Sequence, residues 1–324
     1  MIDFTSTNIR LWSRLGSCGA FGQAALSLPE AEEKTVILTA DVCNFSGLDR
    51  FRAGYPDRVY NVGIAEQNMI GIAAGMAKEG FVPFGATYAA FATMRCADQI
   101  KLCMGYMNLP VKLVGLSAGF SAGILGPTHM SLEDVAFMRA LPNVVILSPA
   151  DCTAAVKATL AAAQLDAPVY LRLTGSMNNP IIYKEDFEFE VGKAIELRAG
   201  EDIAIIATGS MVHHALKSAE LLEQAGFSAE VTDMHTITPL DREAVEKACA
   251  KRLIVTVEEH SASGGLGGAV AEALALKPAR PPHLILGARG AYPHAGDYPF
   301  LLEYSGLTAP QIAERISETC KELF

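Results

Sequence analysis

Short β-rich runs alternate with longer helical runs along nearly the whole chain, and this alternation limits the fold more than any other feature. The runs expected to form strands are 35–39, 81–84, 111–116, 144–147 and 169–173, then 203–207, 229–233, 253–257 and 284–286. Parallel neighbouring strands need a crossover of a dozen or more residues, usually a helix. We therefore expect an α/β protein with two doubly wound, mostly parallel sheets, each covered by helices on both faces.

A break in the pattern separates two such series. The segment 174–179, TGSMNN, precedes Pro180, and from there to Gly200 the chain is charged and aromatic without a clear period. Such punctuation is typical of a connection between domains. The sequence predicts a first domain over residues 1–185, a linker over 186–200 and a smaller, Rossmann-like second domain over 201–324.

Composition excludes several classes of function. A chain of 324 residues that is 50% hydrophobic can bury two cores, and its net charge of −10 argues against a nucleic-acid partner. Its seven cysteines are scattered and form no CxxC, which indicates a reduced, cytoplasmic protein with neither a disulfide framework nor a metal site. The sequence shows no signal-peptide core and no apolar run long enough to cross a bilayer, so we expect no membrane association.

Residues 61–80, NVGIAEQNMIGIAAGMAKEG, carry apolar side chains at helical spacing. Glu66 stands in the expected first turn among small and apolar residues. One interpretation is a glutamate favoured there by the helix macrodipole. The other is a functional carboxyl, because burial among Ile, Ala and Gly raises its pKa and keeps it protonated near neutral pH.

Two aromatic residues follow in the segment ATYAAF. Tyr88 and Phe91 have i, i+3 spacing, which places both rings on one face of an expected helix start. Two rings on one face, with Ala89 and Ala90 leaving room, suit stacking on a flat heterocycle. An ordinary pair of core residues is the alternative.

A histidine follows a Gly-Pro turn in the segment GPTH at 126–129. At the end of an expected strand, His129 either faces a cleft, where it can hydrogen-bond or move a proton, or caps a backbone group. The two interpretations fit the pattern equally well.

A glycine-rich run at 264–268 opens an expected helix after a strand, as a phosphate-binding loop does. Its match to GxGxxG is poor, and no acidic residue follows at the required spacing. Close packing of helix on sheet is the interpretation we prefer.

Four segments together resemble the transketolase family of thiamine-diphosphate enzymes: GIAEQNMIGIAAGMA, ATYAAF, GPTH and VEEHSASGGLGGAVAEAL. The resemblance covers essentially the whole chain, as a pyrimidine-binding domain followed by the transketolase C-terminal domain. It implies that Glu66 bonds the N1′ atom of the cofactor's aminopyrimidine and that Tyr88 and Phe91 stack on that ring. It also implies that His129 reaches the reactive carbons of the substrate. Tyr88 is a mild departure from the family's TFxxF-like segment.

The resemblance also implies substrate contacts. Arg172, in YLRLTG, matches a family position that holds the sugar phosphate, and Arg14 and Ser46 match two further such positions. The alternative for each is an ordinary surface residue, with the arginines in exposed ion pairs.

One family domain has no counterpart in this sequence. The diphosphate-binding domain carries a GDG…N motif that holds Mg²⁺ and the cofactor's diphosphate, and no GDG occurs here. The chain therefore resembles the C-terminal subunit of a split transketolase, which transfers a two-carbon ketol unit from a ketose to an aldose. We expect a partner subunit that supplies the GDG…N motif and Mg²⁺, in an α₂β₂ assembly.

The loop before GPTH departs from the family pattern His-Asp-Ser-x-Gly-x-Gly-Glu-Asp-Gly-Pro-Thr-His. Aligned on GPTH, Ser117 stands at the first His, which helps hold the phosphate, and Ile124 and Leu125 stand at the Glu-Asp pair, which borders the sugar hydroxyls. Loss of polar groups weakens selection for hydroxyls, so we expect an anionic but atypical ketose: sulfonated, branched or deoxygenated. The alternative is a shifted loop in which other residues fill these roles.

Two other functions remain open from the sequence. The residues 97–100, ADQI, faintly resemble the β subunit of a 2-oxoacid dehydrogenase E1, which has the same two domains. A non-catalytic regulatory subunit would also explain the missing domain. The joint presence of Glu66, the aromatic pair and His129 favours an enzyme.

Overall fold

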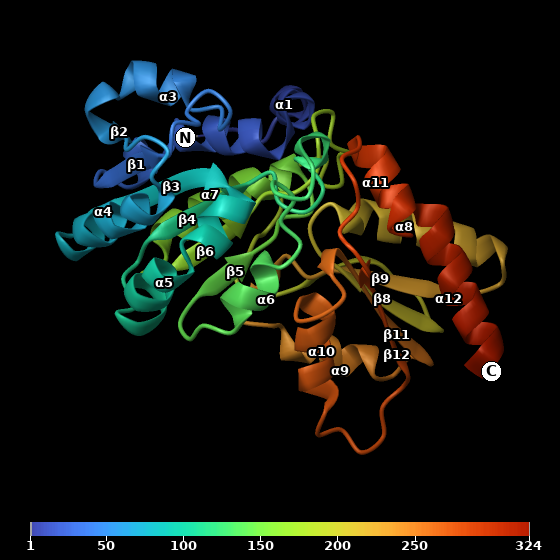
Figure 1. Ribbon diagram of the computed structural model, residues 1–324. Helices are drawn as coiled ribbons and strands as arrows, with labels where there is room; N and C mark the ends of the chain where they lie inside the picture. Colours follow the sequence, from blue (N-terminus) through green and yellow to red (C-terminus); the bar gives the residue numbers. More distant parts are fainter. Residues whose placement is uncertain (1, 324) are drawn as a thin grey trace.

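The computed structural model describes residues 2–323 and shows two α/β units side by side (Figure 1). Within these residues the strands form two mostly parallel sheets, which confirms the expected fold class. No helix in the same range combines the length and apolarity needed to cross a membrane.

The first sheet has the strand order β10-β5-β6-β4-β3-β1-β2. The strands β1 to β6 pair in parallel, and β1 and β4 are buried along their whole length, as expected for a sheet covered on both faces. Their bounds are β1 Thr35–Thr39, β2 Val59–Asn61, β3 Val82–Tyr88, β4 Lys112–Leu116, β5 Val145–Leu147 and β6 Val169–Arg172.

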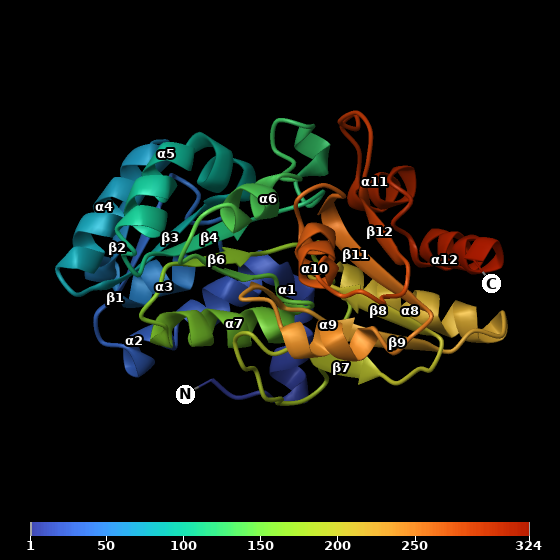
Figure 2. The same cartoon turned by 90° about the horizontal axis from the view of Figure 1, so that it is seen from below.

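Helices cover this sheet on both faces, as Figure 2 shows with α7 on one side and α4 and α5 on the other. One face packs a core against α1 Ser6–Ala25, α2 Leu28–Ala31, α3 Asp49–Gly54 and α7 Cys152–Gln164. The other face packs against α4 Glu66–Lys78, the π-helical η2 Phe91–Arg95, α5 Ala97–Ile100, the π-helical η3 Lys101–Tyr106 and α6 Asp134–Arg139. The loops at the carboxyl ends of the strands are left to form a site.

The second sheet has the order β12-β11-β8-β9-β7. Its strands are β7 Ile195–Arg198, β8 Ile203–Ala207, β9 Ala229–Asp233, β11 Leu253–Ser261 and β12 His283–Ala288. Its helices are α8 Met211–Gln224, α9 Arg242–Ala248, α10 Leu266–Leu274, α11 Tyr298–Tyr304 and α12 Ala309–Leu323. One core lies beneath α8, α11 and α12 and another beneath α9 and α10.

Two strands pair differently from what the predicted division of the chain implies. β10, Thr236–Thr238, follows β9 in the chain but pairs antiparallel with β5 of the first sheet. β7 falls inside the predicted linker 186–200 and forms the antiparallel edge of the second sheet. The second unit therefore begins before residue 201, and it completes the sheet of the first unit.

The glycine-rich run 264–268 serves packing, as expected. A Cβ on Gly267 would lie 2.4 Å from the side chain of Ile285, so only glycine lets α10 sit this close to the sheet. The Glu258 carboxylate accepts hydrogen bonds from the backbone N–H groups of Leu266 (2.7 Å) and Gly267 (2.8 Å). An internal carboxylate thus fills the place that a phosphate takes at such a helix start.

Candidate functional site

The candidate residues lie in loops at the carboxyl ends of the first sheet's strands. Glu66 is the first residue of α4, which follows β2, and Tyr88 is the last residue of β3. Ser117 directly follows β4, and His129 lies in the turn after the 3₁₀ segment η4 Gly123–Leu125. Neighbouring parallel strands end at the same edge, so residues far apart in sequence converge there.

Three aromatic rings form one wall of this site. The His129 ring lies edge-on to Phe91 at 5.0 Å and to Tyr88 at 5.7 Å, and the Tyr88 and Phe91 rings are 6.0 Å apart. Burial raises the pKa of Tyr88, with the charge of Cys18 adding to the effect. Tyr88 and Phe91 lie close together, although Tyr88 ends a strand instead of starting a helix, and the His129 ring joins them.

Glu66 lies beside this wall and is 3% exposed. Its Oε1 atom is 2.8 Å from Nη1 of Arg95, whose guanidinium carbon lies 3.9 Å from the centre of the Phe91 ring. Glu66 is buried, as its small and apolar sequence neighbours suggested, but Arg95 adds a cation that the sequence reasoning did not include. Burial, reinforced by the charge of Glu66, raises the pKa of the adjacent Cys96 to about 12, so this thiol stays neutral.

Comparison with known proteins identifies the family. Residues 17–179 match the family described as transketolase, pyrimidine binding domain, and residues 192–312 match transketolase, C-terminal domain. The chain belongs to the transketolase family.

Two relatives of this transketolase-family chain are named as subunits. The 6-deoxy-6-sulfo-D-fructose transketolase subunit SqwH of Clostridium sp. (strain MSTE9) is 40% identical, over 90% of this chain and 91% of that one. An apulose-4-phosphate transketolase subunit of Phocaeicola vulgatus is 38% identical, over 80% of this chain and 83% of that one.

A solved structure described as a split gene transketolase, inactive beta4 tetramer, superposes with a TM-score of 0.84. It is 36% identical in sequence and aligns over 93% of this chain and 97% of its own. The relatives together support a transketolase-type enzyme subunit with the same two domains.

Arg172 does not occupy the position that the transketolase resemblance implied. Its side chain is 1% exposed, and its Nε atom donates to Asp134 Oδ2 at 2.8 Å. Its Nη2 atom donates to the backbone carbonyl oxygens of Ser131 and Glu259. Arg172 therefore joins α6 to the second unit, and this geometry does not fit a residue that grips an anionic substrate.

The other residues expected to bind substrate differ in their exposure to solvent. Ser46 is fully buried, and its hydroxyl donates to the backbone carbonyls of Val42 and Cys43, so it shapes its own loop. Arg14 is exposed on α1. Ser117 has a φ of 51° and a hydroxyl 3.8 Å from the Cys18 sulfur.

The two apolar residues of the atypical loop are exposed. Ile124 is 77% and Leu125 50% exposed on η4. These two residues, which stand where the family has a Glu-Asp pair, therefore lie on an outward-facing rim of this chain and not in a buried pocket.

Three site residues were missed from the sequence. Arg95 follows Phe91 by four residues, a spacing that a helix places on one face and that was available from the sequence. Phe45, which is 48% exposed, lies with its ring 4.7 Å from that of Tyr88. Cys18 approaches Ser117 from α1. Nothing in their local sequence marks Phe45 or Cys18, because tertiary packing brings them in.

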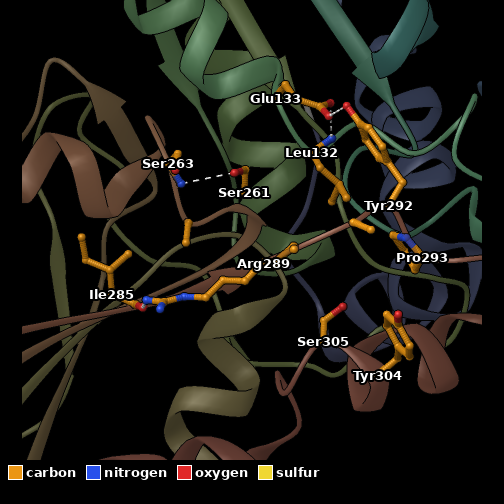
Figure 3. A pocket seen from close by; sticks show the side chains of 14 residues that line it. Leu132, Glu133, Ser261, Ser263, Ile285, Arg289, Tyr292, Pro293, Tyr304 and Ser305 are labelled. Atoms are coloured by element: carbon orange, nitrogen blue, oxygen red, sulfur yellow. Dashed lines mark hydrogen bonds between the residues drawn. The ribbon is translucent and has the colours of Figure 1, made fainter.

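No group of three or more His, Cys, Asp or Glu side chains within residues 2–323 is arranged to hold a metal ion. A cavity of about 590 Å³ lies between the two units and is lined by residues of both (Figure 3). The Tyr292 hydroxyl donates to the Glu133 carboxylate at its edge, which links the second unit to the first. The residues that line this cavity include neither Glu66 nor Tyr88, Phe91 or His129, so the cavity is distinct from the candidate site.

Proposed function

We propose that this chain is the pyrimidine-binding subunit of a split, thiamine-diphosphate-dependent transketolase. The observation that carries the proposal is the placement of the buried Glu66 carboxyl beside the wall formed by Tyr88, Phe91 and His129. A flat ring with a basic nitrogen fits such a site, because aromatic side chains take its faces and a carboxyl meets its edge.

The residues fit the aminopyrimidine half of the cofactor. Glu66 would hold a proton at the N1′ atom of that ring, and Phe91 and Tyr88 would bind its face. When bound, thiamine diphosphate supplies the carbon nucleophile that takes up and passes on the ketol unit. Its diphosphate and Mg²⁺ would belong to the partner, since this chain has no GDG motif.

His129 would act on the substrate. Its Nδ1 atom lies 3.0 Å from the Thr128 hydroxyl, which orients the ring and leaves Nε2 for a substrate oxygen. An imidazole at this position can stabilise a developing alkoxide or carry its proton.

The partner would be a chain with the GDG…N motif, in an α₂β₂ assembly. The subunit names of the two relatives and the split-gene description of the structural neighbour support a divided enzyme. Each active site would then lie between unlike chains, as the family's domain organisation implies.

The substrate would be an atypical anionic ketose, sulfonated or branched. The replacement of a polar family residue by Ser117, and of two further polar residues by Ile124 and Leu125 on the exposed rim, supports this class, as does the naming of one relative for a sulfonated sugar. Arg14, exposed on α1, remains a candidate for the anionic group, whereas Arg172 is committed elsewhere.

The test is to assemble the chain with the partner subunit and compare kcat/KM for 6-deoxy-6-sulfofructose and for xylulose 5-phosphate, each with an aldose acceptor. We expect the sulfonated or a branched ketose to be preferred by at least about tenfold, the discrimination that one altered substrate contact gives. A clear preference for xylulose 5-phosphate with ribose 5-phosphate would refute the substrate class while leaving the transketolase proposal intact. Absence of any ketol transfer would refute both.

A further inference from the structure

Arg95 makes two contacts in the candidate site, and each is with a residue proposed to bind the aminopyrimidine. The first is the ion pair with Glu66, at 2.8 Å between Nη1 and Oε1. The Glu66 side chain is 4% exposed and the Arg95 side chain 44% exposed. A buried carboxylate without a partner is costly, so the guanidinium stabilises Glu66 in the free chain.

The second contact is with Phe91. The guanidinium carbon lies 3.9 Å from the ring centre, within the range of a cation–π interaction. A guanidinium is flat, delocalised and rich in N–H donors, so it stacks on a ring while donating to a carboxylate. These are the same two contacts that a flat, protonated heterocycle would make.

The backbone and the side chain of Arg95 differ in their freedom. Gln67 Nε2 on α4 donates to the Arg95 carbonyl oxygen at 3.0 Å, which fixes the backbone beside α4. The side chain is 44% exposed, and Arg95 is the last residue of η2, so the side chain can turn toward solvent without unfolding a helix. Rotation about side-chain bonds is enough to vacate the site.

We infer that Arg95 is a place-holder, which keeps Glu66 and Phe91 in position in the unloaded chain and gives way when the aminopyrimidine binds. The inference rests on the proposed function, because it takes Glu66 and Phe91 as cofactor contacts. It makes Arg95 a positioning residue whose removal lowers the cost of loading the site.

The experiment measures binding of thiamine diphosphate with Mg²⁺ by calorimetry, using the complex with the partner subunit. Arg95→Ala and Arg95→Gln are compared with Arg95→Lys, which keeps the charge and the pairing with Glu66. We expect the first two variants to bind the cofactor about tenfold more tightly, since a partly exposed ion pair and a cation–π contact no longer compete with it. The lysine variant should stay within about threefold of the parent complex.

Arg315→Ala on α12, which removes an exposed ion pair with Glu318, is the matched control and should leave cofactor binding unchanged. If Arg95 only maintained the structure of the site, the Ala and Gln variants would bind thiamine diphosphate more weakly than the parent complex, because a deformed site binds more weakly. Equal or weaker binding by both Arg95→Ala and Arg95→Gln, with normal binding by the parent complex, would overturn the inference alone. Failure of the parent complex to bind thiamine diphosphate would overturn the proposed function, and the inference with it.

Discussion

The Glu259 carboxylate of the second unit accepts a hydrogen bond from the backbone N–H of Phe120 in the first unit, with Oε1 and N 2.6 Å apart. Gly119 permits this approach, because a Cβ there would lie 2.2 Å from the same oxygen. The other carboxylate oxygen accepts from the hydroxyls of Ser210 and Tyr298 (2.6 Å for Tyr298). The carboxylate is fully satisfied and holds the two units together.

The first prediction concerns this carboxylate. Glu259→Ala leaves three buried donors without an acceptor, so we expect the free energy of unfolding to fall by about 3–5 kcal/mol. Glu259→Gln keeps one acceptor oxygen and should lose less. Urea denaturation of both variants measures the difference, with the exposed Glu318→Ala as control. A loss below about 1 kcal/mol in Glu259→Ala, the range of ordinary surface changes, would show that the link is dispensable.

The second prediction concerns Glu66. Glu66→Gln keeps the shape of the side chain but removes the ionisable proton, so folding and assembly should be unaffected. Hydrogen–deuterium exchange at C2 of thiamine diphosphate in the assembled complex, followed by NMR, should slow by at least about 100-fold, the usual contribution of a positioned acid or base. Unchanged exchange would eliminate Glu66 as the activating carboxyl. Glu79→Gln, just past the carboxyl end of the same helix, is the control.

The third prediction concerns the chain without its partner. A pyrimidine site contacts one end of the cofactor, and no group that could hold a metal is present in residues 2–323. We expect weak binding of thiamine diphosphate that does not respond to Mg²⁺, and no ketol transfer. Calorimetry with and without Mg²⁺ decides this, and tight Mg²⁺-dependent binding by the isolated chain would contradict the assignment of the diphosphate site to a partner.

The fourth prediction concerns pH. Burial raises the pKa of Asp233 to about 8. The hydrogen bond from the Tyr183 hydroxyl, at 2.7 Å, opposes this shift, and the charge of Asp151 adds to it. Between pH 4 and 8 the unfolded chain has released this proton while the folded chain retains it, so stability falls as the pH rises through that window. Asp233→Asn removes the titrating carboxyl. The free energy of unfolding of this variant, measured relative to that of the parent chain, should therefore be higher at pH 8 than at pH 5.

The expected change in the stability difference between Asp233→Asn and the parent chain is about 2–4 kcal/mol over those three pH units. Guanidinium denaturation at both pH values measures it. Parallel stability profiles for the two proteins would mean that Asp233 is ionised when folded.

The regular parts of the fold were readable because buried parallel strands are continuous apolar runs. Residues 35–39, 203–207 and 229–233 were predicted with the bounds that the structure has. α11, by contrast, is a short helix that begins behind an Asp297 cap, and it was missed. The small residues of GATY also concealed the extension of β3 to Tyr88.

The position of a residue in the candidate site was predictable where its own segment places it, as for Tyr88 and Phe91, whose rings lie 6.0 Å apart. It was not predictable where distant segments decide a side chain's partner. Arg172 follows a strand as a substrate arginine would, but Asp134 and the Glu259 carbonyl enclose it. No local pattern contains that information.

The pairing of β10 with β5 has a consequence for synthesis on the ribosome. β6 ends at Arg172 and β10 ends at Thr238, so 66 further residues must be translated before the first sheet can receive its last strand. At about 5–20 residues per second this takes about 3–13 seconds. For that interval the apolar β5 is an open edge on the nascent chain, a template for pairing with other emerging chains. Pauses in translation within the second unit would therefore increase aggregation of the first.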